Sequence, residues 1–402
     1  MRKKFVPCVP AAMAAIVMLS GCGNSTSALP ASSAASDVEV SDSQAEGATE
    51  SEDSPVAITT MEDAYSIGLK DNGYYKDVKA KKLVTLPKDY AHVKISRDDI
   101  TDENGEVEST IQQVTYSYGE REKVDRRAEE GDEVVLDYAG TVDGVAFEGS
   151  TVTDSTLVIG STSNSLGFED DLIGHLAGDE FDVSVKLMEG YPDSKDVEGN
   201  TVTLSGATVD YHITVKEVRE IYLTDEDVAE KLATQGFTMK DGSAVDTVEK
   251  MKQFYREQYE DNVFESMVYN YIIENTTVKE LPEKVLENAR ESYRAEINTV
   301  LTAYKLTEEE YCEQAGSDAK TIDELMESLD DKIQDEVKSR LIIQAIAEKQ
   351  HFKVTDEDIN EYFQNDTLSV QQATKYYGEA FLKQNVLGNK VYTWLVDNAT
   401  LE

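Results

Sequence analysis

The chain has 402 residues, of which 80 are Asp or Glu and 38 are Lys or Arg, so its formal charge is −42. This length allows two or three domains, and 40% apolar with 29% charged residues is a globular composition that excludes a wholly disordered chain. So strong a negative field repels polyanions, which excludes nucleic acid and the ribosome as partners.

The first 22 residues have the pattern of an export signal. Three basic residues precede an apolar run from Phe5 to Leu19, which is short for a membrane span. The run ends in Leu-Ser-Gly-Cys, which is similar to the lipobox of bacterial lipoproteins. The resemblance implies cleavage after residue 21, a diacylglyceryl group on Cys22 and, with a second acyl chain such as palmitate, firm attachment to the extracytoplasmic face of a bacterial cell membrane.

Loss of residues 1–21 would change the formal charge from −42 to −45 and remove Cys8. With Cys22 acylated, only Cys312 remains, so no internal disulfide is expected. Residues 22–60 are mostly Ser, Ala, Thr, Asp and Glu, which cannot bury enough surface to fold. We predict that they form a disordered acidic tether.

Residues 61–127 give mixed signals. Short extended pieces are predicted at 84–86 and 93–95, and a polar helix at 96–118 that is interrupted by a turn near Asn104-Gly105. We predict that this segment is a linker that packs on the helical part of the chain.

Residues 128–219 are predicted to form a small antiparallel β domain. Eleven of the 23 Gly lie between Gly131 and Gly206. Alternating strands are predicted at 132–142, 157–159, 181–187 and 209–215, with a hairpin at Asp143-Gly144 and one short helix between Phe168 and His175.

Residues 220–402 have helical periodicity throughout. Apolar residues recur at spacings of three and four over 248–271 and 286–304, and from Ile322 to Ala345 as one helix started by Thr321. A short helix is predicted from Thr355 to Phe363 and a last one over 370–398. The predicted fold class is therefore α+β, with a small sheet domain followed by an all-α domain.

Two motifs in the β region carry a family resemblance. The segment Gly-Asp-Glu-Val-Val-Leu-Asp-Tyr at 131–138, with Asp143-Gly144 and Phe147-Glu148-Gly149, resembles FKBP-type peptidyl-prolyl isomerase domains. The segment from Gly167 to Asp179 resembles trigger factor, and the resemblance covers roughly residues 80–400. It implies a peptidyl-prolyl cis-trans isomerase domain joined to a helical chaperone domain, without the basic ribosome-docking loop of that family.

The resemblance also implies the site. The pocket positions are Tyr138, Phe147, Glu148, Phe168, Tyr191 and Tyr211, and the positions that bind the substrate backbone are Asn164, Ser165 and Leu166. Three features depart from the family: Ser155 stands where a ring is common, Asn164-Ser165 replace an apolar pair, and the segment between Tyr191 and Tyr211 is longer. Leu166 offers apolar surface if this loop shifts by one residue.

The expected function is that of a membrane-anchored foldase. Its partners would be unfolded or nascent exported polypeptides, through their X-Pro segments, and the membrane through the lipid anchor. No metal or cofactor is expected, because such an isomerase needs none and the four His show no ligand spacing. One alternative is a non-catalytic holdase on the same fold, since core packing explains Tyr138 and Phe147 as well as a substrate contact does. The other is a solute-binding lipoprotein, which requires repeated strand-helix alternation.

The helical region carries further rings outside its apolar stripes. Phe254, Tyr269 and the pair Tyr376-Tyr377 are expected either to lie accessible in a client-binding cleft or to pack between helices and against residues 61–127.

Overall fold

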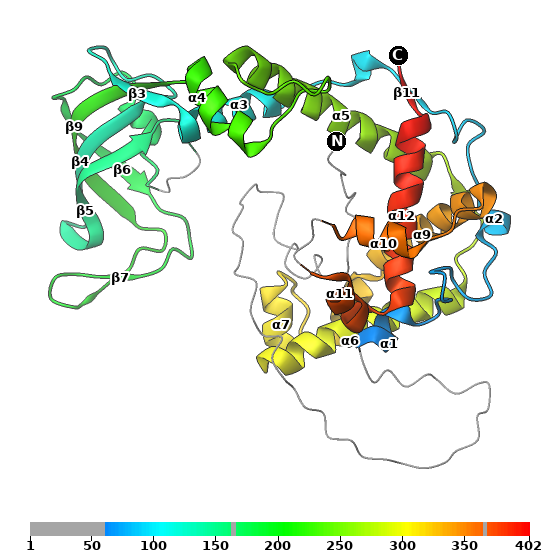
Figure 1. The fold of residues 1–402 in the computed structure, drawn as a ribbon. Helices are drawn as coiled ribbons and strands as arrows, with labels where there is room; N and C mark the ends of the chain where they lie inside the picture. The colour runs from blue at the N-terminus through cyan, green and yellow to red at the C-terminus, as the bar shows by residue number, and fades with distance from the viewer. Residues whose placement is uncertain (1–60, 162–165, 365–367) are drawn as a thin grey trace. The chain divides into compact units, whose positions relative to one another are not determined.

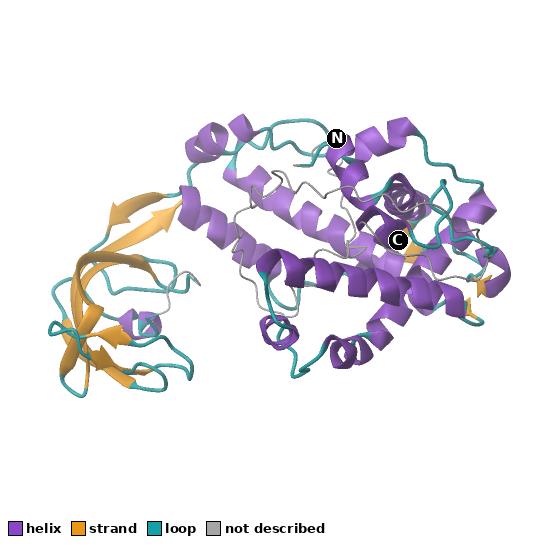
Figure 2. Cartoon of the chain, turned by 90° about the horizontal axis from the view of Figure 1, so that it is seen from below, coloured by secondary structure: helices purple, strands orange, loops and turns teal. Residues whose placement is uncertain are grey.

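The computed structural model describes residues 61–161, 166–364 and 368–402 (Figure 1). These residues form two compact units, one made of residues 61–97 with Phe264–Glu402 and the other of Asp98–Val263. The main sheet lies in the second unit and most long helices in the first (Figure 2), so the chain is α+β as predicted. The signal segment, Cys22 and the tether up to residue 60 lie outside the described residues.

The central sheet of the second unit is antiparallel. Its order is β3-β9-β4-β5, and β6 pairs with the part of β9 that β3 leaves free. Asp143 and Gly144 both have positive φ, 51° and 80°, which matches the two-residue hairpin turn predicted between β4 and β5. The strands are β3 (Glu120–Lys123), β4 (Glu133–Val142), β5 (Val145–Val158), β6 (Glu180–Lys186) and β9 (Thr208–Tyr222).

Three elements of this unit differ from the prediction. The strand predicted at 157–159 is the end of the 14-residue β5, whose alternation is broken where Asp154 adopts a φ of 54°. The helix predicted between Phe168 and His175 is only a 3-10 turn, η2 (Glu169–Leu172), between the positive-φ residues Gly167 and Gly174. A small hairpin, β7 (Ser194–Lys195) with β8 (Thr201–Val202), was not predicted because its sequence is polar and does not alternate.

A second, smaller core holds the helices of this unit together. Ile111 of α3 (Glu106–Tyr118) packs with Val228 of α4 (Asp225–Lys231) and Met251 at the start of α5 (Val248–Glu274). Residues 98–127 thus pack on part of the predicted helical region, as expected. Both 98–127 and 220–263 belong to the same unit as the sheet, however, whereas the sequence analysis assigned 220–263 to the helical domain. The predicted turn before α3 is present, and its Asp102 carboxylate accepts hydrogen bonds from the Glu106 and Val107 N–H groups.

Residues 61–97 fold onto the helices of the first unit. β1 (Val84–Thr85) pairs with β10 (Thr277–Val278), and β2 (Lys94–Ile95) pairs with β11 (Thr400–Leu401) near the C-terminus. The Glu348 carboxylate accepts hydrogen bonds from two N–H groups of α2 (Ala80–Leu83). Non-local strand pairs and a distant carboxylate thus hold this segment in place.

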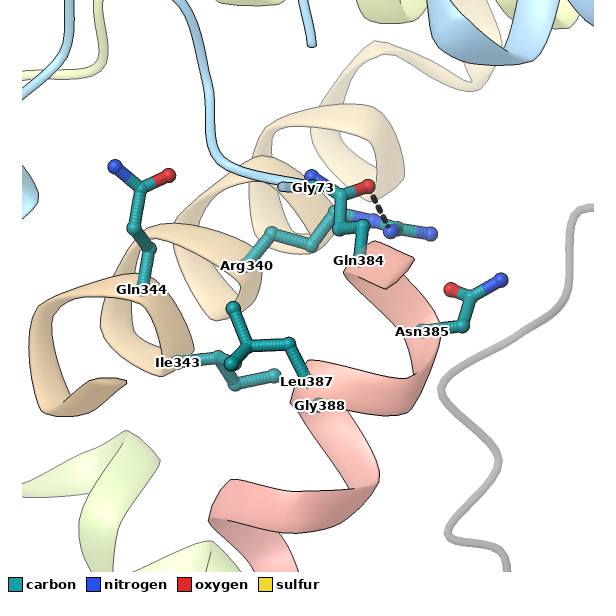
Figure 3. A pocket seen from close by; sticks show the side chains of 8 residues that line it. All are labelled: Gly73, Arg340, Ile343, Gln344, Gln384, Asn385, Leu387 and Gly388. Carbon is teal, nitrogen blue, oxygen red and sulfur yellow. Dashed lines mark hydrogen bonds between the residues drawn. The ribbon is translucent and has the colours of Figure 1, made fainter. Parts of the chain in front are cut away.

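Gly73 makes the closest approach of this segment to a helix. A Cβ at Gly73 would lie 2.5 Å from the backbone nitrogen of Gln384 in α12 (Glu379–Asn398). Figure 3 shows Gly73 beside Gln384, whose amide oxygen accepts a hydrogen bond from Arg340 of α9 (Asp330–Gln350). The cavity beside them is about 10 Å³, roughly the space of one water molecule.

The helices predicted from the spacing of apolar residues are present, but two of them are each divided into two shorter helices. The stripe from Ile322 breaks at Leu329, and the last helix breaks at Gly378, whose φ of 79° and ψ of 148° are not helical. Thr321 and Thr355 cap the helices that they were predicted to start. The remaining helices are α1 (Met61–Ser66), α6 (Glu283–Tyr304), α7 (Glu308–Gln314), α8 (Ile322–Ser328), α10 (Asp356–Tyr362) and α11 (Val370–Tyr377).

The rings outside the stripes mostly pack between elements. Phe254 meets Phe237 edge-on at 5.6 Å, Tyr269 lies 5.9 Å from Tyr392, and Tyr377 lies 5.1 Å from Tyr65 of α1. Among these rings Tyr376 is the exposed one, at 38%. Of the two expected arrangements, the structure therefore shows packing and not an open cleft. The partners are Phe237, Tyr392 and Tyr65, which helical periodicity does not reveal.

None of the helices within the described ranges has the length and apolar character needed to cross a bilayer.

Candidate functional site

Three of the predicted pocket residues form a cluster of aromatic rings. Tyr138 on β4, Phe168 before η2 and Tyr211 on β9 meet edge-on, with centroid separations of 5.7 Å for Tyr138–Phe168, 5.9 Å for Tyr138–Tyr211 and 5.0 Å for Phe168–Tyr211. All three rings are buried, and Phe168 is 0% exposed. We call these three residues the ring triad. Edge-to-face packing of this kind fixes the ring orientations.

The strand pairing positions two members of the ring triad. Tyr138 on β4 is paired with Ile213 on β9, and Tyr211 on β9 is paired with Gly140 on β4. Because side chains alternate along a strand, residues two apart on each of these strands point to the same face of the sheet. Tyr138 and Tyr211 therefore meet across neighbouring strands.

Two glycines that the sequence analysis did not assign to the site shape it. A Cβ on Gly140 would lie 2.6 Å from the Tyr211 ring, so the ring occupies the space of the missing side chain. Gly167 precedes Phe168 with a φ of +81°, and a Cβ there would lie 2.8 Å from Val185. A glycine inside a strand is the signal that marks Gly140 as a site of close approach.

Gly140→Ala should displace the Tyr211 ring, because the added Cβ overlaps two ring carbons and Val209. We expect a loss of about 1–3 kcal/mol in the unfolding free energy of the second unit, typical of overpacking. Denaturant titration would measure this loss. Gly144→Ala is the control for a nearby glycine, since a Cβ there meets no atom within 4 Å; it tests only the cost of a positive φ. A Gly140→Ala variant that is as stable as the wild type would contradict the contact.

The other predicted site residues divide into three groups. Phe147, Leu166 and Tyr191 are half-buried against the core that contains the ring triad. Glu148 is exposed, and its backbone carbonyl accepts a hydrogen bond from the Ser194 hydroxyl at 3.3 Å, which ties the β7–β8 hairpin to β5. Asn164 and Ser165 lie outside the described residues.

The hydroxyls of the ring triad stay neutral at physiological pH. Burial, assisted by Tyr138, Tyr191 and Glu169, raises the pKa of Tyr211 to about 12, and burial also raises the pKa of Tyr138. One carboxylate oxygen of Glu169 is buried without a hydrogen bond to any of the described residues. The ring triad is thus a buried aromatic cluster whose two Tyr hydroxyls can only donate or accept hydrogen bonds.

Ser155, which stands where the family commonly has an aromatic ring, lies on β5 opposite Leu136 and is half-buried. A ring at this position would add apolar area to the sheet that carries Tyr138.

Comparison with known proteins identifies both parts of the chain. Residues 124–216 match the model of FKBP-type peptidyl-prolyl cis-trans isomerase, and residues 241–397 match that of the bacterial trigger factor protein C-terminus. The predicted resemblance to both is confirmed.

Curated relatives cover most of the chain. Trigger factor of Streptococcus thermophilus (strain CNRZ 1066) is 28% identical over 291 residues, 69% of this chain and 64% of that protein. Trigger factor of Streptococcus mutans serotype c is 26% identical over 339 residues, 80% of this chain and 75% of that protein. The chain thus spans just under two thirds of the length of the first relative.

One solved structure, described as "Promiscuous Substrate Recognition in Folding and Assembly Activities of the Trigger Factor Chaperone", is similar at 18% identity. It covers 78% of this chain and 73% of its own, with a TM-score of 0.35, which is too low to support an argument about this chain.

The chain therefore contains an FKBP-type peptidyl-prolyl isomerase domain followed by a trigger factor C-terminal domain. In this domain pair it is a homologue of the trigger factors.

Proposed function

We propose that the protein is a membrane-anchored, extracytoplasmic peptidyl-prolyl cis-trans isomerase and chaperone that assists the folding of exported proteins. The isomerase activity is proposed because the ring triad lies within residues 124–216, which match the FKBP-type isomerase family. The chaperone part rests on the trigger factor C-terminal domain that follows.

The ring triad suits the chemistry of amide rotation. An X-Pro bond resists rotation because resonance polarises its carbonyl, and unaided isomerisation takes tens to hundreds of seconds. Water supports the polarised form by hydrogen bonding to the carbonyl oxygen. An aromatic surface that excludes water removes this support from the planar amide more than from the twisted one, which lowers the barrier.

The alternative function is a non-catalytic holdase on the same fold. It is favoured by Ser155, which stands opposite Leu136 where the family resemblance implies a ring, and by the polar Asn164-Ser165 pair in the sequence. Two assays on the full chain separate the alternatives. An isomerase accelerates cis-trans exchange of an X-Pro peptide, whereas a holdase only suppresses aggregation of a denatured protein. Suppression without acceleration would establish the holdase.

The clients that fit this charge are neutral or basic unfolded polypeptides. A net charge of −42 attracts cationic segments and repels acidic ones, and it also excludes the ribosome and nucleic acid from the proposed partners.

The proposed anchor is Cys22, which lies outside the described residues. Replacing Cys22 with Ser removes the thiol that would be acylated, so the protein should leave the membrane fraction and incorporate no radiolabelled lipid. Cys312→Ser is the matched control, because Cys312 is a buried thiol in the helical unit. Membrane retention and labelling of the Cys22→Ser variant at wild-type levels would refute the anchor.

A further inference from the structure

A carboxyl group is buried among the helices of the first unit without a compensating cation. Glu296 lies near the middle of α6 and is only 5% exposed. Among the described residues no Lys or Arg pairs with it. The titratable groups that face it come from four other helices and from α6 itself: Tyr65 on α1, Tyr311 on α7, Glu336 on α9, Tyr376 on α11 and Tyr293 on α6.

The neighbouring carboxyl of Glu336 is compensated. It accepts hydrogen bonds from Arg340 Nε at 2.8 Å and from the Tyr293 hydroxyl at 2.7 Å. Arg340 is thus engaged by Glu336, and Glu296 remains the unpaired acid of this cluster. An ionised carboxylate at such a site is costly, so the site favours the protonated form.

The element that covers Glu296 is the short helix α1. Its Tyr65 ring is 4% exposed and packs 4.9 Å from Phe381 and 5.1 Å from Tyr377. The Tyr65 hydroxyl faces the Glu296 carboxyl but is buried without a hydrogen bond of good geometry.

The packing beneath α1 is incomplete. A cavity of about 50 Å³ adjoins Tyr65, and its lining includes Ser292 and Tyr293 of α6 and the charged pair Glu336 and Arg340 of α9. Two side-chain hydrogen bonds connect the C-terminal half of α1 to its neighbours, from Ser292 to the Ala64 carbonyl and from Ser66 to the Tyr377 carbonyl. A helix of only six residues, which packs through Ala64 and Tyr65, can leave its site without unfolding the longer helices beneath it.

We propose that Glu296 is a proton-controlled latch for α1: the protonated carboxyl holds α1 on the helical unit, and its ionisation releases α1. Release admits water to the carboxylate, which removes the cost of burying the charge. This device does not depend on the isomerase or chaperone activity proposed above.

The direction of the pH effect follows from the burial. Burial raises the pKa of Glu296 from 4.5 to about 7; the facing Tyr65 hydroxyl lowers it somewhat and Glu336 raises it. A raised carboxyl pKa in the docked state means that docking is strongest at low pH and weakens as pH rises through about 7. Between pH 5 and pH 8 the equilibrium constant for opening should rise on the order of 50-fold.

Hydrogen exchange of residues 61–66 in the full chain tests this latch, with rates corrected for the intrinsic effect of pH. The wild type should lose protection in α1 on the order of 50-fold between pH 5 and pH 8, with a midpoint near 7. Glu296→Gln, a neutral side chain of the same shape, should keep α1 protected at both pH values.

Glu291→Gln on the exposed side of the same helix is the matched control and should keep the wild-type response. Circular dichroism would establish that the variants are folded. The proposal is overturned if protection of α1 in the wild type is independent of pH, or if Glu296→Gln retains the pH response.

Discussion

Phe168→Ala should abolish most of the proposed isomerase activity and destabilise the second unit. Phe168 is fully buried and contacts both other rings of the ring triad. Truncation of a buried Phe costs about 3–5 kcal/mol of unfolding free energy. Loss of only 1.4 kcal/mol of transition-state binding already lowers the rate about tenfold, so we expect kcat/KM for an X-Pro peptide to fall by more than about tenfold.

Phe181→Ala separates this loss from general destabilisation. Phe181 is a half-buried ring of the same core, stacked on His175 at a centroid distance of 3.9 Å and outside the ring triad. It should lower the stability of the second unit while leaving kcat/KM close to wild type under folding conditions. Equal losses of activity in the two folded variants would show that the ring triad has no special role.

Arg340→Leu should give the largest loss of stability in the helical unit. Arg340 is 8% exposed; it pairs with Glu336, donates to Gln384 and lies 5.4 Å from the Phe381 ring centroid. Its removal leaves the half-buried Glu336 carboxylate without its cation, and we expect a cost toward the lower end of the about 3–5 kcal/mol that is typical of a fully buried pair. The only Trp of the chain, Trp394, packs against the core of this unit, so its fluorescence reports unfolding there.

Two further variants make the Arg340 prediction specific. Arg294→Leu breaks a pair with Asp323, whose side chain is 82% exposed, and should cost no more than about 1 kcal/mol. The double variant Arg340→Leu with Glu336→Leu removes both charges and should recover much of the loss. A single Arg340→Leu variant that unfolds at the wild-type denaturant concentration would contradict the account of this pair.

The features that the sequence predicted are local ones. The Asp143-Gly144 turn, the strands around it and the helix starts at Thr321 and Thr355 follow from a few neighbouring residues each. The helices predicted from apolar periodicity are also present in the structure. Periodicity could not reveal the break at Gly378, because a single Gly is tolerated within a helical pattern.

The features that the sequence missed depend on distant residues. Gly140 matters because Tyr211, on another strand, fills its space, and Tyr377 of α11 packs against Tyr65, which is more than 300 residues away in the sequence. The motif resemblance placed Tyr138, Phe168 and Tyr211 together, whereas nothing in the sequence indicated that Glu296 would be buried beneath α1.

Proline-limited refolding of a denatured protein tests the central claim most directly, because the client must be both held and isomerised. The full chain, at concentrations well below that of the refolding protein, should accelerate the slow phase, and Phe168→Ala should not. A slow phase that keeps its spontaneous rate in the presence of the folded wild-type chain would contradict the proposal that this protein is an isomerase.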